Sequence, residues 1–421
     1  MRWAAVLLLI GASLSLVTPS RAEAVTPAIK HVWIITLENE EADTTFGPGS
    51  PAHFLNTTLR AEGTFVPNYY GTGHLSLDNY IAMVSGQGPN AVTQADCPLY
   101  VDVVPGTIGL DGQAYGQGCV YPATVKTIAD QLEAKGLTWK GYMQDMGNDP
   151  TREAATCAHP ALNSQDHTQA ATAKDSYATR HNPFMYFHSI IDEPTCHTNV
   201  VALPPLLTDL AAEATTPNFS FITPSLCEDG HDAPCADGRP GGLVSADAFL
   251  STWVPKIMAS PAYRAGGMIV INFDEATVQG DASACCGEQP NPGGSPMPGI
   301  HGQGGGRTGA VVLTPFTKPA TVTTQAYNHY SLLRSIEDLF GLTHLGFAGA
   351  DGLVAFGADI YNAPVASPAT TTTTVTPRPT KARGEVLPRT GGDAPVAGMT
   401  AVGVALVVVR VRRRVARRNA A

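Results

Sequence analysis

Basic residues are scarce in the body of this sequence. The chain has 421 residues, with 26 Lys and Arg against 36 Asp and Glu. The segments up to Ala24 and beyond Thr390 hold eight of the arginines and two of the acids, so the part between them has 18 basic and 34 acidic residues and a net charge of −16. Such a surface repels nucleic acid and anionic membranes at long range. The composition therefore argues against a nucleic-acid-binding protein.

The sequence also lacks CxxC pairs, which disfavours a zinc–thiolate site. Eight cysteines are present, and an even number in a chain with an export signal indicates disulfides, although sequence alone does not fix their pairing. Order along the chain favours the pairs Cys97–Cys119, Cys157–Cys196 and Cys227–Cys235. The remaining two, Cys285 and Cys286, are either a vicinal pair or partners for other cysteines.

The N-terminus has the pattern of a secretory signal peptide. Arg2 precedes an apolar run from Ala4 to Val17, and Ala22-Glu23-Ala24 supplies an A-x-A cleavage site. A buried first strand or helix is the alternative, and the flanking pattern disfavours it. We therefore expect residues 1–24 to be a signal peptide and the protein to be secreted.

The C-terminus predicts attachment to a cell wall. Residues 363–386 are rich in Pro and Thr and predict an extended stalk. Residues 387–421 hold Leu-Pro-Arg-Thr-Gly, a mostly apolar stretch and an arginine-rich tail, an order that resembles the sorting signal of Gram-positive bacteria. In such signals a sortase cuts between the threonine and the glycine, here Thr390 and Gly391, and links the protein to peptidoglycan. A plain membrane anchor is the alternative, but the apolar stretch is short for a transmembrane span.

Apolar runs of strand length alternate with helical patterns between these ends, over residues 25–362. Strands are predicted at His31–Leu37, Leu137–Met143, Phe219–Thr223, Gly267–Phe273 and Ala310–Thr314. Helices are predicted at Phe54–Glu62, behind Ser76, and at Thr124–Lys135, Leu206–Ala214, Ala246–Ala259 and Tyr330–Phe340. Near-continuous apolar strands that alternate with helices indicate one α/β domain, with a mostly parallel central sheet and helices on both faces.

Polar clusters follow three of the predicted strands. These clusters are Glu38-Asn39, the loop Asp229-Gly230-His231-Asp232, and Asp274-Glu275. Ligands of parallel sheets collect at the carboxyl ends of the strands. Adjacent acids repel each other at low dielectric, and a bound cation relieves that repulsion. A turn cap or a solvated loop start is the alternative for the two acidic pairs.

In Gly73-His74-Leu75-Ser76-Leu77-Asp78-Asn79-Tyr80, Ser76 lies just ahead of a helical run from Tyr80 to Ser85. A helix N-terminus offers unpaired N–H groups and the positive end of a dipole, which suit a phosphate. An ordinary helix cap has the same pattern of Ser with a polar residue three positions later. No G-x-S-x-G elbow is present, which disfavours a Ser-His-Asp esterase.

Taken together, these clusters resemble those of the bacterial phosphoesterase family, which includes phospholipases C and metal-dependent acid phosphatases of the alkaline phosphatase superfamily. The resemblance covers about His31 to Leu342. The residues that carry it are Glu38-Asn39, Ser76-x-x-Asn79, Asp229-Gly-His231-Asp232, Asp274-Glu275, Gly304-Gly305-Gly306-Arg307 and the segment from His329 to Glu337. It implies an alkaline phosphatase-like fold. Asp78 stands where the family usually has proline; its carboxylate could weaken anion binding or face solvent.

The resemblance implies a metal site and a nucleophile. A divalent metal ion would bind Glu38, Asn39, Ser76, Asp274 and Glu275, since carboxylate and amide oxygens are hard ligands. Coordination would lower the pKa of the Ser76 hydroxyl and align it for attack on phosphorus.

The resemblance also implies the groups that handle phosphate. Asn79 would hydrogen-bond a phosphoryl oxygen. His231 is favoured as a catalytic residue, ahead of His329 and His301, which are placed as phosphate contacts. The glycines before Arg307 are expected to form a turn, with Arg307 as a further phosphate contact.

The predicted function is hydrolysis of a phosphate ester through a phosphoserine, as in an acid phosphatase or a phospholipase C. The sequence leaves the choice between monoester and diester open, as it does the number of metal ions. A wall-displayed adhesin that keeps the fold without catalysis is the alternative from another class. A sulfatase-like enzyme is disfavoured, because no C/S-x-P-x-R context surrounds Ser76.

Overall fold

The structure is a computed structural model that describes residues 28–292 and 297–363. The predicted signal peptide, the sorting signal with Thr390 and Gly391, and the stalk beyond residue 363 lie outside these ranges. Within them, no helix is long and apolar enough to cross a membrane.

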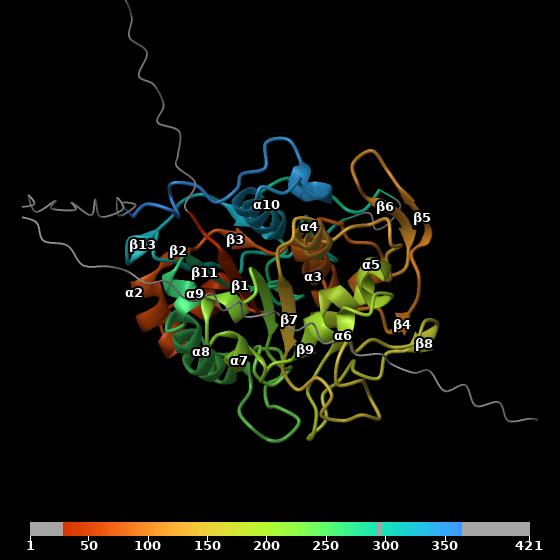
Figure 1. Cartoon of the computed structure of the whole chain (residues 1–421), viewed down its shortest axis with the longest axis horizontal. Coiled ribbons are helices and arrows are strands. Elements are labelled where there is room, and N and C mark those ends of the chain that lie inside the picture. Colours follow the sequence, from red (N-terminus) through yellow and green to blue (C-terminus); the bar gives the residue numbers. More distant parts are fainter. Residues whose placement is uncertain (1–27, 293–296, 364–421) are drawn as a thin grey trace, which may run out of the picture. The chain divides into compact units, whose positions relative to one another are not determined.

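A central sheet organises the described part of the chain (Figure 1). Its strands lie in the order β13 (Thr321–Val322), β2 (Thr64–Val66), β12 (Ala310–Leu313), β11 (Gly267–Phe273), β1 (His31–Leu37), β10 (Phe219–Thr223), β7 (Trp139–Met143) and β9 (Val200–Ala202). The block β11-β1-β10-β7-β9 is parallel throughout, and only β12 runs antiparallel to its neighbours β11 and β2. The expected mostly parallel sheet is confirmed.

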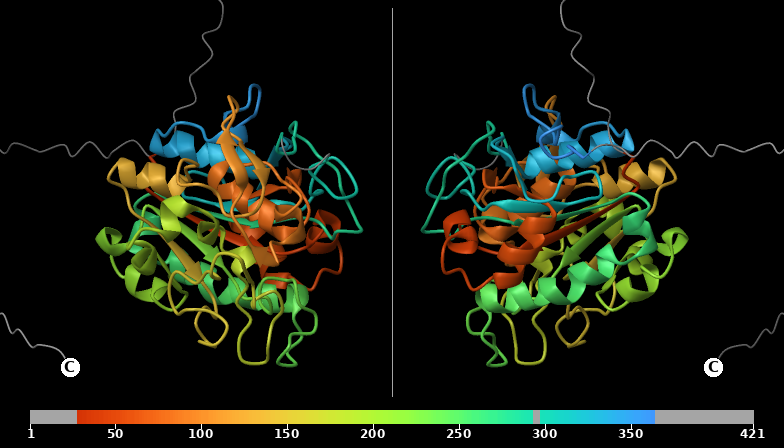
Figure 2. Two further views of the ribbon diagram at one scale, coloured as in Figure 1. Left: turned by 90° about the vertical axis from the view of Figure 1, so that its right-hand side faces the viewer. Right: turned by 90° about the vertical axis from the view of Figure 1, so that its left-hand side faces the viewer.

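Helices cover both faces of this sheet, as expected. Side chains of β1 alternate between two apolar cores: Val32 and Ile34 face one, while Trp33 and Ile35 face the other. The first core is closed by α3 (Ser76–Ser85), α4 (Ile128–Ala134) and α10 (His329–Phe340). The second is closed by α7 (Leu206–Asp209), α8 (Gly242–Met258) and α9 (Pro261–Arg264). Figure 2 shows α10 in blue above the sheet and α8 in green below it.

Most predicted elements form where the apolar pattern placed them, and their ends differ. The predicted strands at β1, β10 and β11 have the predicted bounds. Helix α4 begins four residues later than predicted, because Thr127 caps it in a capping box with Asp130. The predicted helix at Leu206–Ala214 ends at Asp209. The segment Phe54–Glu62 divides into a π-helical turn, Leu55–Leu59, and α2 (Arg60–Glu62).

The remaining elements are short and lie in the loops. They are the helices α1 (Ala42–Phe46), α5 (His188–Ile191) and α6 (Cys196–Asn199), and the strand pairs β3 (Tyr69–Tyr70) with β14 (Tyr327–Asn328), β4 (Leu99–Tyr100) with β8 (Ser164–Gln165), and β5 (Val104–Ile108) with β6 (Ala114–Gln117). Four disulfides join Cys97 to Cys119, Cys157 to Cys196, Cys227 to Cys235 and Cys285 to Cys286. The favoured pairing is confirmed, and the last two cysteines form the vicinal pair.

Candidate active site

The predicted site residues Glu38, Ser76 and Asp274 lie together at the carboxyl edge of the sheet. Strands β1 and β11 are adjacent and parallel, so Glu38 and Asp274, which directly follow them, are neighbours. Ser76 is the first residue of α3, and its hydroxyl donates a hydrogen bond of 2.8 Å to Glu38 Oε2. Both carboxylates are fully buried, and Ser76 is 3% exposed. A serine at a helix N-terminus thus faces two buried acids.

Asn39 joins the two carboxylates, whereas Glu275 is held elsewhere. The Asn39 backbone N–H donates to Asp274 Oδ1 at 3.1 Å, and its side-chain Nδ2 donates to Glu38 Oε2 at 3.1 Å. Glu275 Oε2 contacts Nδ1 of His74, and both side chains are buried. Burial lowers the pKa of His74 to about 4. His74 therefore holds the predicted ligand Glu275.

Two residues absent from the predicted ligand set complete this cluster. His181 Nε2 lies 3.3 Å from Glu38 Oε1, and its Nδ1 lies 3.2 Å from Asp229 Oδ2. The His181 ring stacks on Tyr80, with ring centroids 5.1 Å apart, and the Tyr80 hydroxyl donates to Glu38 Oε1 at 2.6 Å. Ligand atoms of Glu38, His181 and Asp229 all lie within 4.8 Å of one another. These three residues are close enough to share one metal ion.

The sequence gave a usable signal for one of these two residues. Asp229 lies in the polar loop after β10, and its place near a strand end marks it as a candidate. His181 lies in Thr179–His181, a single 3-10 turn in a long stretch without apolar periodicity. Nothing local distinguishes it from the other histidines of the chain, and only the fold brings it to Glu38.

Negative charge is concentrated in this cluster. Burial raises the pKa of Glu38, of Asp229 and of Asp274 well above the ordinary range of a carboxyl, and in each case a neighbouring carboxylate adds to the effect. Burial also lowers the pKa of His181, so its ring favours the neutral form. A cation bound here would stabilise the ionised carboxylates.

The donor atoms fit a divalent metal ion. Asp229 Oδ2 and Asp274 Oδ2 are buried and have no hydrogen-bond partner among the described residues. Carboxylate and hydroxyl oxygens suit hard divalent cations, and an imidazole nitrogen extends the choice to transition metals. The residues that would hold the ion are Glu38, Ser76 and Asp274, with Ser76 at Oε2 of Glu38. His181 lies at Oε1 of Glu38 and Asp229 lies next to His181, so both could add ligand atoms.

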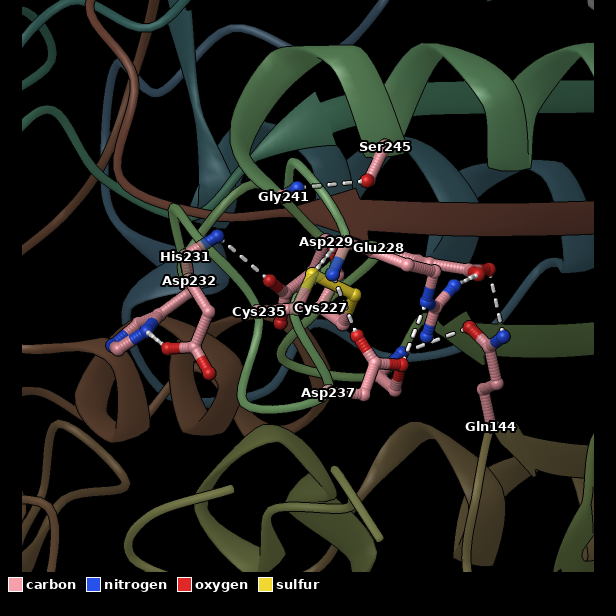
Figure 3. The surroundings of a disulfide bond; sticks show 12 residues. Gln144, Cys227, Glu228, Asp229, His231, Asp232, Cys235, Asp237, Gly241 and Ser245 are labelled. Atoms are coloured by element: carbon pink, nitrogen blue, oxygen red, sulfur yellow. Dashed lines mark hydrogen bonds and ion pairs between the residues drawn. A yellow bond between two sulfur atoms is a disulfide. The ribbon is translucent and has the colours of Figure 1, made fainter. Parts of the chain in front are cut away.

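His231 lies at the rim of the cluster on a loop closed by a disulfide (Figure 3). The Cys227–Cys235 bond closes this loop, which follows β10. The backbone N–H of His231 donates to Asp229 Oδ1 at 2.8 Å, and its ring Nδ1 lies 2.8 Å from Asp232 Oδ1. Its side chain is 34% exposed. His231 therefore combines a place beside the buried acids with access to solvent.

Asn79 lies beside the site and its side chain organises the loop before Ser76, while its contact with phosphate stays a prediction. Its Oδ1 accepts hydrogen bonds from the backbone N–H and hydroxyl of Thr72 and from the N–H of Gly73. Its Nδ2 donates to the carbonyls of Gly73 and Leu75. All of its hydrogen-bonding groups are engaged within the protein, and the residue is fully buried. Asn79 shapes the loop that leads to Ser76.

His329 also has partners within the protein, and its contact with phosphate stays a prediction. Its Nε2 donates to the backbone carbonyl of Asp274 at 2.5 Å, and its Nδ1 accepts from the Tyr69 hydroxyl at 3.0 Å. Burial lowers its pKa to about 4. Both ring nitrogens are thus used behind Asp274. His301, in contrast, is exposed and lies close enough to His74 to contribute to that residue's lowered pKa.

The glycine-rich loop before Arg307 is a packing element, as expected. A Cβ on Gly305 would lie 2.2 Å from the Gly73 carbonyl oxygen, so only glycine permits this approach to the serine loop. Arg307 pairs with Asp43 at 2.7 Å and donates to the Pro67 carbonyl, so it is engaged away from Ser76. The contact of Arg307 with phosphate stays a prediction.

Asp78 is buried rather than facing solvent. It is 1% exposed, and a Cβ on Gly73 would lie 2.6 Å from its Oδ1. Burial raises its pKa well above the ordinary range, and Asp96 adds to the shift. The solvent-facing alternative for this departure from the family pattern is therefore wrong.

The carboxyl edge of this α/β sheet brings the serine that begins α3 against buried acids, an arrangement typical of a hydrolase with a metal site. The chain belongs to the Phosphoesterase family, whose model matches residues 50–343.

Relatives with described activities are distant. The chain is 23% identical over 342 residues to a probable acid phosphatase of Kluyveromyces lactis, covering 80% of this chain and 65% of that one. It is 24% identical to an acid phosphatase of Aspergillus fumigatus, covering 75% and 55%. It is 22% identical to a phosphatidylinositol-3-phosphatase of Mycobacterium tuberculosis, covering 78% and 82%. The chain therefore spans less than two thirds of the length of the two fungal relatives.

Among solved structures, an alkaline phosphatase superfamily protein of Vibrio parahaemolyticus aligns with a TM-score of 0.44 at 12% identity. The alignment covers 77% of this chain and 71% of that one.

Proposed function

We propose that this protein is a metal-dependent phosphoesterase that hydrolyses phosphate esters through a phosphoserine at Ser76. The observation that carries the proposal is the hydrogen bond from the Ser76 hydroxyl, at the N-terminus of α3, to Glu38 beside Asp274. Membership of the Phosphoesterase family and the acid phosphatase relatives support a phosphoric ester as the substrate.

The first step is attack of Ser76 Oγ on phosphorus. The hydroxyl proton already points to Glu38 Oε2, so the carboxylate receives it as the Oγ–P bond forms. A divalent ion held by Glu38, Ser76 and Asp274 would lower the pKa of the hydroxyl and draw charge from the phosphoryl oxygens. The bond from phosphorus to the leaving oxygen breaks on the side opposite Ser76.

The leaving oxygen and the second step need a proton carrier with solvent access. His231 fits this role, because it lies at the rim of the cluster and is partly exposed. It gives a proton to the leaving alkoxide and then takes one from the water that attacks the phosphoserine. Breaking the Oγ–P bond returns the proton from Glu38 to Ser76 and releases inorganic phosphate or a phosphomonoester.

We also propose that the enzyme acts outside the cell, held on a Gram-positive cell wall. The signal-peptide pattern, the stalk and the sorting motif at Thr390-Gly391 support this location. Four disulfides in the described residues support an oxidising compartment. Sortase and peptidoglycan would then be partners of the C-terminal segment. Mass spectrometry of the muramidase-released protein tests this, and an intact C-terminus beyond Gly391 would contradict it.

Hydrolysis of p-nitrophenyl phosphate by Ser76→Ala tests the chemistry. We expect loss of turnover by about 10⁴-fold or more with little change in melting temperature, because the nucleophile is removed and the buried site keeps its packing. Ser85→Ala is the matched control, since Ser85 lies on the same helix and its hydroxyl bonds the Ile81 carbonyl and the Gln87 N–H rather than an acid of the site. Acid-quenched wild-type enzyme should carry phosphate on the peptide with Ser76.

Metal dependence is measured separately from turnover. The wild-type protein should hold bound divalent metal by elemental analysis, and Asp274→Asn should hold much less. Asp281→Asn is the control, because Asp281 lies on a nearby loop and binds Ser283 and the Arg307 backbone instead. A fully active protein without metal, or a metal-bound protein that cleaves no phosphate ester, would contradict the proposal; the latter favours the adhesin alternative.

A further inference from the structure

The side chains that the sequence pattern assigns to phosphate already have partners within the protein. Asn79 and His329 use all of their polar side-chain atoms within the protein, and Arg307 is paired with Asp43. A phosphate ester bound at Ser76 therefore needs other donors. The buried arginine nearest to the acid cluster along the chain is Arg180, which directly precedes His181.

Arg180 is built into the site and has donor capacity left. It is 3% exposed, and its NH1 donates to the Gln169 carbonyl at 2.9 Å. Its NH2 lies 3.3 Å from Nε2 of His231, and its Nε lies 3.5 Å from Asp96 Oδ2. Among the described residues, Nε forms no hydrogen bond at all. Two of the three guanidinium nitrogens thus have only long contacts, on the side that faces His231 and Asp96.

A single carboxylate separates this guanidinium from the helix that carries the nucleophile. Asp96 Oδ1 accepts a hydrogen bond of 3.0 Å from the Leu77 N–H, and its other oxygen contacts Arg180. Leu77 is the neighbour of Ser76 in the first turn of α3. A phosphoryl group has oxygens spaced much like those of a carboxylate, so it offers the Arg180 fork the same kind of acceptor that Asp96 does.

We propose that Arg180 binds two non-bridging oxygens of the substrate phosphate and makes the enzyme selective for phosphomonoesters over phosphodiesters. This inference rests on the proposed phosphoesterase function. Arg180 is 3% exposed, so we expect an ester group on an oxygen that it contacts to fit poorly. His231 is the partly open side, and the single ester group of a monoester leaves there. A monoester also carries one more negative charge than a diester, which a buried guanidinium binds more strongly.

The competing explanation is that Arg180 only neutralises Asp96. A double variant separates the two roles, because Asp96→Asn removes the charge that Arg180 would have to balance. If neutralisation were its only role, Arg180→Gln combined with Asp96→Asn would restore activity. If Arg180 binds phosphate, the double variant stays as impaired as Arg180→Gln alone.

The test compares p-nitrophenyl phosphate with bis(p-nitrophenyl) phosphate as substrates. Arg180→Gln should lower kcat/KM for the monoester by about 10²-fold, chiefly through KM, and lower it less than about tenfold for the diester; it should also weaken inhibition by inorganic phosphate. Arg180→Lys should recover only part of the loss, because an ammonium cannot form the fork. Arg152→Gln is the matched control, since Arg152 ties the same segment together through the carbonyls of Ala170 and Asp175.

The outcomes distinguish this inference from the proposed function. Equal losses on both substrates, or rescue in the double variant, would overturn the role of Arg180 while leaving a serine phosphoesterase intact. If wild-type protein cleaves neither substrate, the proposed function fails. Calorimetric binding of inorganic phosphate to metal-loaded protein then tests the role of Arg180 independently of turnover. Loss of phosphate binding in Arg180→Gln but not in Arg152→Gln supports an anion site at Arg180, and equal phosphate binding by the two variants contradicts it.

Discussion

Ser76 and Glu38 are 38 residues apart in the chain, and a hydrogen bond of 2.8 Å joins the serine hydroxyl to Oε2 of the carboxylate. The other oxygen, Oε1, accepts from the hydroxyl of Tyr80 at 2.6 Å. Ser76 and Tyr80 are one helical turn apart on α3, so side chains on one face of this helix donate hydrogen bonds to both oxygens of Glu38. The carboxylate is thereby fixed in orientation as well as in position.

Glu38→Gln should therefore inactivate the enzyme without unfolding it. The amide cannot take the serine proton, and we expect kcat to fall by about 10²- to 10⁴-fold. Removal of a buried charge offsets the weaker hydrogen bonds, so the melting temperature should stay level or rise. Steady-state kinetics and thermal unfolding measure the two effects. Glu41→Gln is the control; a Glu38→Gln enzyme with near-normal kcat would remove Glu38 from the chemistry.

Asn79→Ala should act on stability and kcat rather than on phosphate binding. The substitution leaves the buried N–H groups of Thr72 and Gly73 without their acceptor, which costs on the order of 3 kcal/mol in the free energy of unfolding. Urea unfolding measures this cost, with the surface variant Asn199→Ala as the control. Unchanged stability together with a raised KM would instead restore Asn79 as the phosphate contact that the sequence pattern implies.

The Cys227–Cys235 disulfide should matter to catalysis more than a disulfide far from the site. Its loop of 8 residues carries Asp229 and His231, and loop closure of that length accounts for about 2.5 kcal/mol of stability. Replacement of both cysteines by serine should lower stability by roughly that amount and also reduce kcat. The Cys157–Cys196 pair is the control, because its removal should lower stability and leave kcat near normal. Equal effects on kcat would argue against a positioning role for the loop.

The free energy of unfolding should fall as the pH rises from about 4.5 to about 8, because the carboxyl of Glu153 has a raised pKa in the native state. Burial, with help from Asp175, raises the pKa of Glu153 from its ordinary value of 4.5 to about 8. The native state then keeps a proton that the unfolded state has lost, so this group's contribution is complete below about pH 4.5 and disappears by about pH 8. The limiting slope for one proton is about 1.4 kcal/mol per pH unit.

Glu153→Gln isolates this effect from other titrating groups. The amide does not ionise. The free energy of unfolding of the variant should therefore decline less than that of the wild type between about pH 5 and about pH 8, where Glu153 loses its stabilising contribution. Chemical unfolding at a series of pH values gives the comparison, and exposed Glu193→Gln is the control. Parallel curves for wild type and Glu153→Gln would show that the carboxyl titrates normally in the native state.

The acids of the site were predictable because they follow apolar strands. Glu38 and Asp274 end β1 and β11, two runs whose residues are all buried, and parallel strands of one sheet bring their carboxyl ends together. The same logic marks the loop after β10. A short apolar run followed by an acid thus predicts both a strand and a site. The sequence does not predict which strands lie next to each other in the sheet.

His181 and Arg180 could not be predicted in this way. They lie in a segment that forms only short 3-10 turns and has no periodic apolar face. Asn79 shows the opposite difficulty, because its position three residues after Ser76 is typical of a ligand contact, while its actual partners are backbone groups. Sequence identifies the polar residues near a site, but backbone hydrogen bonds decide which of them stay available to a ligand.

Every residue of α3 is buried, and this burial fixes the direction in which a substrate can come. Ser76 is the first residue of the helix, so a substrate would meet it at the helix N-terminus, and in-line displacement would carry the departing group away from α3. We therefore expect phosphomonoesters that differ only in the size of the alcohol to be hydrolysed at similar rates.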